Sequence, residues 1–90
     1  MIDRDRVAAA LRDSLHTVAE IPADKVSPDA SIVSLGLDSL RLSEVIMEVE
    51  ALLSLELPEA TLLRLNDATT VGAIEQIVSE ALAAHEEKVA

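Results

Sequence analysis

Several residue types are absent from this sequence of 90 residues, and each absence excludes a kind of structure. There is no cysteine, so the chain can form neither a disulfide nor a thiolate metal site, which fits a reducing compartment. There is no phenylalanine, tyrosine or tryptophan, so the interior must be built from aliphatic side chains. The small size and the large apolar fraction, half of all residues, predict one domain with one core.

Long apolar runs are also missing. None approaches the roughly 20 residues that a membrane-spanning helix needs. The N-terminal stretch MIDRDRVAAALRD carries charges where a signal peptide would need its apolar region. We therefore expect a cytoplasmic protein that has no membrane partner.

Basic residues are scarce, with seven Lys and Arg against 17 Asp and Glu and a formal net charge of −10. Nucleic-acid binding is disfavoured, because it requires a basic patch that neutralises phosphates. Such acidity can serve solubility alone. Its distribution favours a docking surface for basic partners, because one base, Arg41, stands among the acids of the stretch from 38 to 59, which are Asp38, Glu44, Glu48, Glu50, Glu56 and Glu59.

Apolar residues recur at helical spacing in most of the chain. A first helix is predicted from Asp3 to about Glu20, ended by Pro22. A long ordered loop with aliphatic anchors follows, and we expect it to run the length of the molecule and to deliver Ser39 at one end. The second helix, LRLSEVIMEVEALLSL, is the most regular, with an apolar stripe of Leu42, Val45, Ile46, Val49, Leu52 and Leu53.

The second half of the chain predicts two more helices. A short third helix falls in EATLLRLND, after Pro58. A last helix opens at a cap on Thr69 or Thr70 and repeats Val71, Ile74, Val78, Ala81 and Leu82. No strand pattern appears, so the fold class is all-α: a small four-helix bundle occupying 1–84, with a frayed tail at 85–90.

Ser39 lies in GLDSLR, directly before the pattern of the second helix. A helix N-terminus offers unpaired N–H groups and a partial positive charge, so a phosphodiester on this serine would be well placed. Gly36 permits a backbone turn that presents the serine outward. The alternative is a serine that caps the helix and a glycine that only makes a turn.

Intrinsic catalysis is not supported by this motif. A nucleophile elbow needs glycine two residues before and two after the serine, where this sequence has Leu37 and Arg41. A serine nucleophile also needs a base, and the two histidines lie in the first helix, at His16, and in the tail, at His85. Glu44 and Glu48 lie one helical turn apart without any further ligand pattern, so no metal site is predicted.

The stretch LGLDSLRLSEVIMEVEALLSLELPEATL, within an acidic chain that predicts four helices, resembles the acyl carrier protein family. Asp38, Ser39 and Leu40 match the family's D-S-L attachment motif, with Gly36 two residues before the aspartate. The similarity extends from the first helix through DATTVGAIEQIV. It implies that a phosphopantetheinyl transferase moves 4′-phosphopantetheine from coenzyme A onto Ser39. The arm's thiol would then hold acyl groups as thioesters.

The resemblance also implies roles for the residues around Ser39. Asp38 would help orient the transferase site, and Leu40 and Met47 would supply apolar contacts. Glu44 and Glu48 match positions that meet basic patches on acyl-transferring, ligating or condensing enzymes. The carrier would be a monomer, and electrostatic docking would make its encounters with partners fast, transient and sensitive to salt.

Arg41 is also predicted to contact partners. It departs from the fatty-acid carriers, which usually have an acid at this position, so the resemblance indicates polyketide, fatty-acid-like or another specialised biosynthesis.

Two alternatives stay open at this point. One is a peptidyl or aminoacyl carrier of a nonribosomal-peptide-type pathway, although Asp38 and the acidic second helix favour the acyl type. The other is a plain interaction module with an unmodified Ser39. A further hypothesis is that the aliphatic core opens between the second and third helices to shelter an acyl chain, near Val45, Ile46, Leu62 and Leu63.

Overall fold

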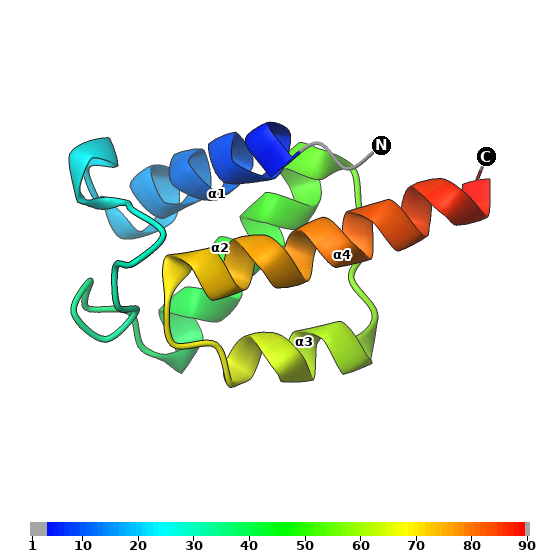
Figure 1. Cartoon of the computed structure of the whole chain (residues 1–90). Helices are drawn as coiled ribbons and strands as arrows, with labels where there is room; N and C mark the ends of the chain where they lie inside the picture. Colours follow the sequence, from blue (N-terminus) through cyan, green and yellow to red (C-terminus); the bar gives the residue numbers. More distant parts are fainter. Residues whose placement is uncertain (1–3, 90) are drawn as a thin grey trace.

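The computed structural model describes residues 4–89, with side chains described as far as residue 85, and this part of the chain is helical (Figure 1). Its elements are α1 (Arg4–Ala19), the 3-10 helix η1 (Ala23–Lys25), α2 (Ser39–Leu53), α3 (Glu59–Asn66) and α4 (Val71–Val89). The prediction of an all-α bundle with three longer helices and one short third helix is confirmed. Asp3, where the first helix was expected to begin, lies outside the described residues.

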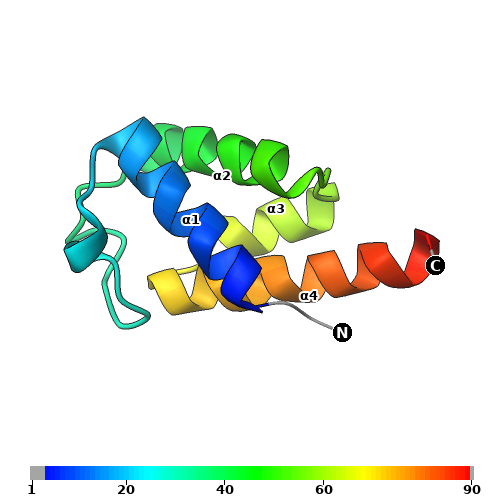
Figure 2. The same ribbon diagram turned by 90° about the horizontal axis from the view of Figure 1, so that it is seen from above.

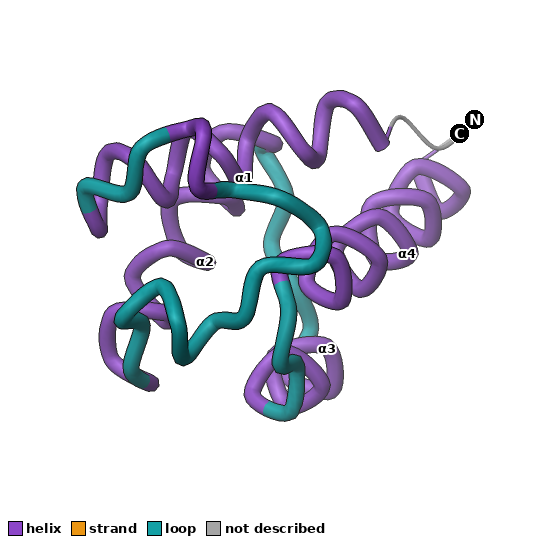
Figure 3. Tube along the Cα trace, turned by 60° about the vertical axis from the view of Figure 1, so that its left-hand side comes forward, coloured by secondary structure: helices purple, strands orange, loops and turns teal. Residues whose placement is uncertain are grey.

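The helices pack so that α1 contacts both α2 and α4, while α3 packs against α4. Helices α1 and α2 are antiparallel neighbours, and the end of α1 lies beside the start of α2 (Figures 1 and 2). The expectation that the long loop runs the length of the bundle is therefore wrong. The loop instead crosses one end of the bundle, where α1 ends and both α2 and α4 begin (Figure 3).

The core is aliphatic, as the composition requires, and it draws on every long helix and on the loops between them. The apolar stripe predicted for α2 is buried except for Leu52, which is 48% exposed. That part of the prediction is wrong, because at the end of α2 only the adjacent Leu53 faces the interior. The most deeply buried apolar side chains are Val7, Leu11, Leu15, Val45, Val49, Leu65, Val71, Ile74 and Val78.

The long loop from residue 20 to residue 38 is anchored to the bundle by buried side chains. Ile32 and Leu37 are buried in the core, and Val26 and Leu35 pack partly against it, as expected of an ordered loop with aliphatic anchors. Val33, another aliphatic residue of this loop, is 83% exposed. It lies in the tight turn that ends at Gly36 and therefore points away from the core side of the loop.

Backbone hydrogen bonds attach the same loop to the start of α4. The amides of Val71 and Gly72 donate to the carbonyls of Ala30, at 3.0 Å, and Pro28, at 2.9 Å. In return, the amide of Ile32 donates to the carbonyl of Thr69 at 3.0 Å. The loop thus satisfies N–H groups of α4 that have no partner within the helix.

The ends of α4 differ in how well the sequence predicts them. Of the two caps proposed, Thr70 is the one used, since its Oγ1 accepts a hydrogen bond from the amide of Ala73 at 3.2 Å. The helix continues to Val89, beyond the last apolar residue of the predicted repeat, Leu82. The domain boundary at residue 84 stays a prediction, and Ala90 lies outside the described residues. Within 4–89, no helix combines the length and the apolar character needed to cross a membrane.

The contact between Gly72 and Pro28 generates a prediction about stability. A Cβ atom at Gly72 would lie 2.9 Å from the Pro28 carbonyl oxygen, closer than side chains tolerate. Overpacking of this kind costs about 1–3 kcal/mol, against at most about 1 kcal/mol gained in helix propensity. We expect Gly72→Ala to lower the free energy of unfolding by about 1 kcal/mol, measured by urea denaturation. Gln76→Ala, at an exposed position of the same helix, is the control, and a Gly72→Ala variant that is stabilised would contradict the prediction.

Candidate attachment site and docking surface

Ser39 is the first residue of α2, and the residue before it caps the helix. Asp38 has extended backbone angles, and its Oδ1 accepts a hydrogen bond from the amide of Arg41 at 2.8 Å. This is the arrangement of an N-cap residue. The alternative in which Ser39 itself caps α2 is therefore wrong, and Asp38 takes that role.

The hydroxyl group of Ser39 is left available by this arrangement. The residue is exposed, and in the described part of the chain its hydroxyl forms no hydrogen bond with another residue. Its carbonyl oxygen is engaged instead, since Ser43 Oγ donates to it at 2.9 Å. A free hydroxyl thus stands on the first turn of a helix, where unpaired amides and the helix dipole favour an anion.

Gly36 shapes the backbone that leads into this turn. Its φ is +79°, in the left-handed region, and a Cβ added there would meet nothing within 4 Å. Glycine is therefore required by the backbone rather than by lack of space. Its amide donates to Val33 and the next amide, of Leu37, donates to Ile32, so the chain turns sharply before α2. The turn buries Leu37 and leaves Asp38 and Ser39 at the surface.

These features fit a phosphopantetheine group on Ser39. The exposed hydroxyl can be reached by another protein, and a phosphodiester at this point would lie at the positive end of α2. Ser39 lies at the end of the bundle that holds the long loop, away from the start of α1 and the end of α4 (Figures 1 and 2). An arm attached there would project away from those two helix ends.

The residues predicted to meet partners follow Ser39 along α2. Leu40 is 71% exposed and Met47 is 66% exposed, although both are large apolar side chains. Glu44 is exposed and Glu48 is partly exposed. Leu40, Glu44 and Met47 share a helix face, because they are spaced by four and three residues. The structure therefore brings these residues together as one apolar and acidic surface beginning at Ser39.

Arg41 is placed differently from its neighbours. Its Nη1 donates to the carbonyl oxygen of Val18, in the last turn of α1, at 2.9 Å. A side chain predicted to contact partners is thus engaged within the fold. Arg41 is exposed, as Leu40 and Glu44 are, but its side chain reaches across to α1.

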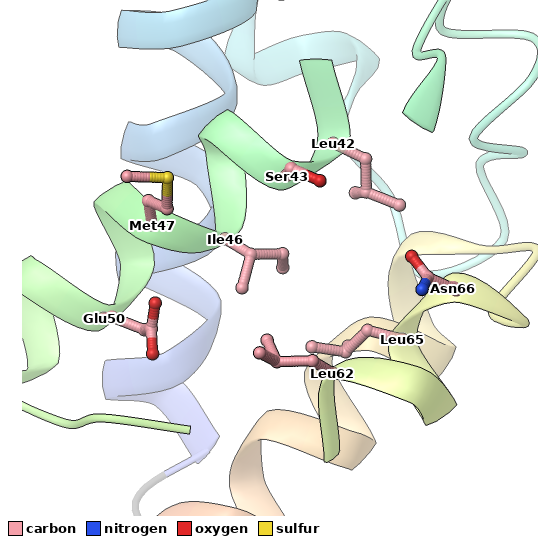
Figure 4. Close-up of a pocket in the computed structure, with 8 residues that line it drawn as sticks. All are labelled: Leu42, Ser43, Ile46, Met47, Glu50, Leu62, Leu65 and Asn66. Carbon is pink, nitrogen blue, oxygen red and sulfur yellow. The ribbon is translucent and has the colours of Figure 1, made fainter. Parts of the chain in front are cut away.

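A groove of about 190 Å³ lies between α2 and α3 (Figure 4). Ile46 and Leu62 point toward each other across it, and Leu42 and Leu65 add to its apolar lining. Its polar lining comes from Ser43, Glu50 and Asn66, and Met47 lies at its edge on the α2 side. Of the four residues that the sequence associated with an opening of the core, Ile46 and Leu62 line the groove, whereas Val45 is fully buried and Leu63 faces outward.

Glu50 has a structural role that the sequence did not reveal. Its Oε2 accepts a hydrogen bond from the amide of Leu57 at 2.7 Å, across the segment that joins α2 to α3. In the same segment, Ser54 adopts the left-handed conformation and ends α2. Glu50, counted above among the acids of a docking surface, therefore holds this connection and one end of the groove.

Comparison with known protein families identifies the family to which the chain belongs. Residues 9–83 match the model of the family described as "Phosphopantetheine attachment site". The chain belongs to this family of carrier domains, as the resemblance implied. It is a non-catalytic domain that carries a covalent 4′-phosphopantetheine, and it therefore works with a phosphopantetheinyl transferase and with partner enzymes.

A curated relative gives a second comparison. Over 57 residues the chain is 40% identical to the methylphloroacetophenone synthase of Cladonia uncialis. The match covers 63% of this chain but only 2% of the length of that synthase. The similarity therefore concerns one small region of a much longer protein.

The cap at Asp38 generates a prediction about stability. Replacing an N-cap aspartate by alanine leaves a backbone amide without its partner and costs about 1 kcal/mol. We expect Asp38→Ala to lower the free energy of unfolding by about that amount, measured by urea denaturation. Asp38→Asn should keep most of the wild-type stability, because asparagine is also a good cap residue. Glu44→Ala, which removes one exposed acid from the same helix, is the control for charge. Equal stability of Asp38→Ala and Glu44→Ala would show that the cap contributes nothing.

Proposed function

We propose that Ser39 is the residue to which phosphopantetheine is attached. The observation that carries the proposal is the cap: Asp38 takes the backbone hydrogen bond at the start of α2, and the Ser39 hydroxyl stays free and exposed. The D-S-L motif and the family match, which spans this position, support the same assignment.

The attachment step follows from the chemistry of coenzyme A. The Ser39 oxygen attacks the phosphorus that bears the pantetheine, and a new phosphoester bond forms there. The pyrophosphate bond breaks, 3′,5′-ADP leaves, and the hydroxyl proton passes to a base of the transferase. When bound, the group supplies a thiol that holds an acyl chain as a thioester. Ser39 then anchors the tether, which raises the effective concentration of that chain at a docked active site.

Docking is proposed for the surface of α2 that begins at Ser39. Leu40 and Met47 supply apolar contacts, and Glu44 and Glu48 face basic patches on acyl-transferring, ligating or condensing enzymes. Contacts of this kind associate quickly and dissociate quickly, and they weaken as salt rises. That behaviour suits a carrier that visits several enzymes in turn.

We propose a polyketide-type pathway as the context. The support is the similarity to one small region of a long synthase, the methylphloroacetophenone synthase of Cladonia uncialis. Arg41, where fatty-acid carriers usually have an acid, agrees with specialised rather than primary biosynthesis. A peptidyl or aminoacyl carrier is the second candidate, because it would share the bundle and the serine; loading by amino-acid-activating enzymes separates the two.

The groove between α2 and α3 is proposed to shelter the acyl chain. It lies on the side of α2 that carries Leu42 and Ile46, and it has an apolar lining of aliphatic side chains. Burying apolar surface of a bound chain there would contribute about 0.8 kcal/mol per methylene group. Its volume of about 190 Å³ suits a short chain without rearrangement of the core.

The attachment proposal is tested by co-expression with a promiscuous phosphopantetheinyl transferase, followed by intact-mass analysis. We expect the wild-type chain to gain the mass of one phosphopantetheinyl group and Ser39→Ala to gain none, because the nucleophilic oxygen is gone. Ser43→Ala is the matched control, an exposed serine one turn further along α2, and it should be modified like the wild type. Modification of Ser39→Ala, or none of the wild type, would refute the assignment.

The groove proposal is tested by methyl NMR on the apo, holo and acylated forms. We expect shifts of the Ile46 and Leu62 methyl groups that depend on the acyl chain and not on the arm alone, because these side chains line the groove. Val45, which is buried outside the groove, and Leu63, which faces outward, are internal controls. Identical spectra for the holo and acylated forms at Ile46 and Leu62 would rule out shelter in this groove.

A further inference from the structure

Helix α1 ends beside the attachment site, and its last turn has an incomplete set of partners. Glu20 adopts the left-handed conformation, with φ of 59°. Its amide donates to the carbonyl of His16 at 3.0 Å, and the amide of Ile21 donates to that of Leu15 at 3.2 Å. Together with the left-handed Glu20, these backbone bonds cap the C-terminus of α1. The carbonyl of Val18 lies beyond their reach and needs a donor from elsewhere.

Arg41 is that donor, across 23 residues of sequence. Its Nη1 lies 2.9 Å from the Val18 oxygen. The C-terminal end of a helix carries partial negative charge, so a guanidinium group there is favoured by the helix dipole as well as by the hydrogen bond. Within the last turn of α1 itself, the basic residue is the exposed His16. Helix α2 thus supplies the permanent cation that α1 lacks at this end.

The same residue also belongs to the first turn of α2. Its backbone amide donates to Asp38 Oδ1 at 2.8 Å while its side chain reaches α1. Ser39 lies between Asp38 and Arg41 in the sequence. The turn that carries the hydroxyl is therefore held from two directions, by the cap of its own helix and by the end of the neighbouring helix.

We infer that Arg41 is a positioning residue for the modification of Ser39: its bond to Val18 fixes the hydroxyl relative to α1. This inference rests on the proposal that Ser39 is the attachment residue. A transferase that docks on the surface of the bundle must find the hydroxyl at a fixed place relative to its own bound coenzyme A. Displacement of a reacting group slows the chemical step even where binding is unchanged. Arg41 therefore acts through Ser39 and not as a contact with the transferase.

The experiment measures phosphopantetheinyl transfer to the apo protein at saturating coenzyme A, with the concentration of the carrier varied. For Arg41→Ala we expect kcat to fall by about three- to tenfold, with KM within about twofold of the wild type. Arg64→Ala is the matched control: it also removes one exposed arginine that bonds a neighbouring helix, since Arg64 Nη2 lies 3.0 Å from Glu80 Oε2 on α4. Its kcat and KM should equal those of the wild type.

Hydrogen exchange on the free apo proteins supplies a readout that needs no partner. Arg41→Ala should exchange faster than the wild type at the amides of Ile21 and Leu42, which lie on either side of the lost bond, and at no amide of α4. Arg41→Gln keeps a shorter donor and should show smaller changes of the same kind; it replaces Arg41→Ala if that variant does not fold.

Three results would overturn the inference. A rise in KM with unchanged kcat and unchanged exchange would make Arg41 a docking contact. If Arg41→Ala matched Arg64→Ala in kcat, in KM and in hydrogen exchange at Ile21 and Leu42, the bond from Arg41 to Val18 would have no role in the modification. Failure of the wild-type chain to be modified at Ser39 would refute the attachment proposal itself. The wild-type sample shows that failure directly, so it can be told apart from an effect of the Arg41 variants.

Discussion

The hydrogen bond between the Asp38 carboxylate and the Arg41 amide is the constraint on which the proposed chemistry at Ser39 depends. Aspartate and serine are both good cap residues, and they stand next to each other at the start of α2. If the serine capped the helix, its oxygen would be engaged by the backbone and would be a poor nucleophile. Because the aspartate caps the helix instead, Ser39 is free for modification while the helix still begins at a satisfied end.

The rest of the architecture keeps that first turn in place. The loop before it is attached to the start of α4 by Ala30 and Pro28, and Ile32 and Leu37 are buried beneath it. Arg41 joins the same turn to the end of α1. Helix α1 directly, and α4 through the loop, therefore fix the position of α2 at this end, whereas α3 packs against α4 and leaves the groove beside α2. The bundle is closely packed around the turn proposed for modification and more open beside the groove proposed for an acyl chain.

Much of this could be predicted from the sequence, because helical periodicity records which residues are buried. The four helices follow from that periodicity, the aliphatic core follows from the absence of aromatic residues, and the turn at 36–39 was indicated by the GLDSLR motif. The choice of Asp38 over Ser39 as the cap could not be predicted, because both residue types suit the role. Contacts between distant segments were also beyond reach: the bond from Arg41 to Val18 and the route of the loop depend on how α1 and α2 pack. The groove was expected only in outline, because its lining is set by the separation of α2 from α3.

The turn that carries Ser39 lies at the end of the bundle opposite the start of α1 and the end of α4, and this placement bears on how the domain can be built into larger assemblies (Figure 1). A covalent connection at either of those two helix ends would lie far from an arm on Ser39, the attachment residue proposed above. The fold is therefore equally suited to sit between catalytic modules on one polypeptide, to be fused to another protein, or to be immobilised on a solid support with its reactive end facing outward.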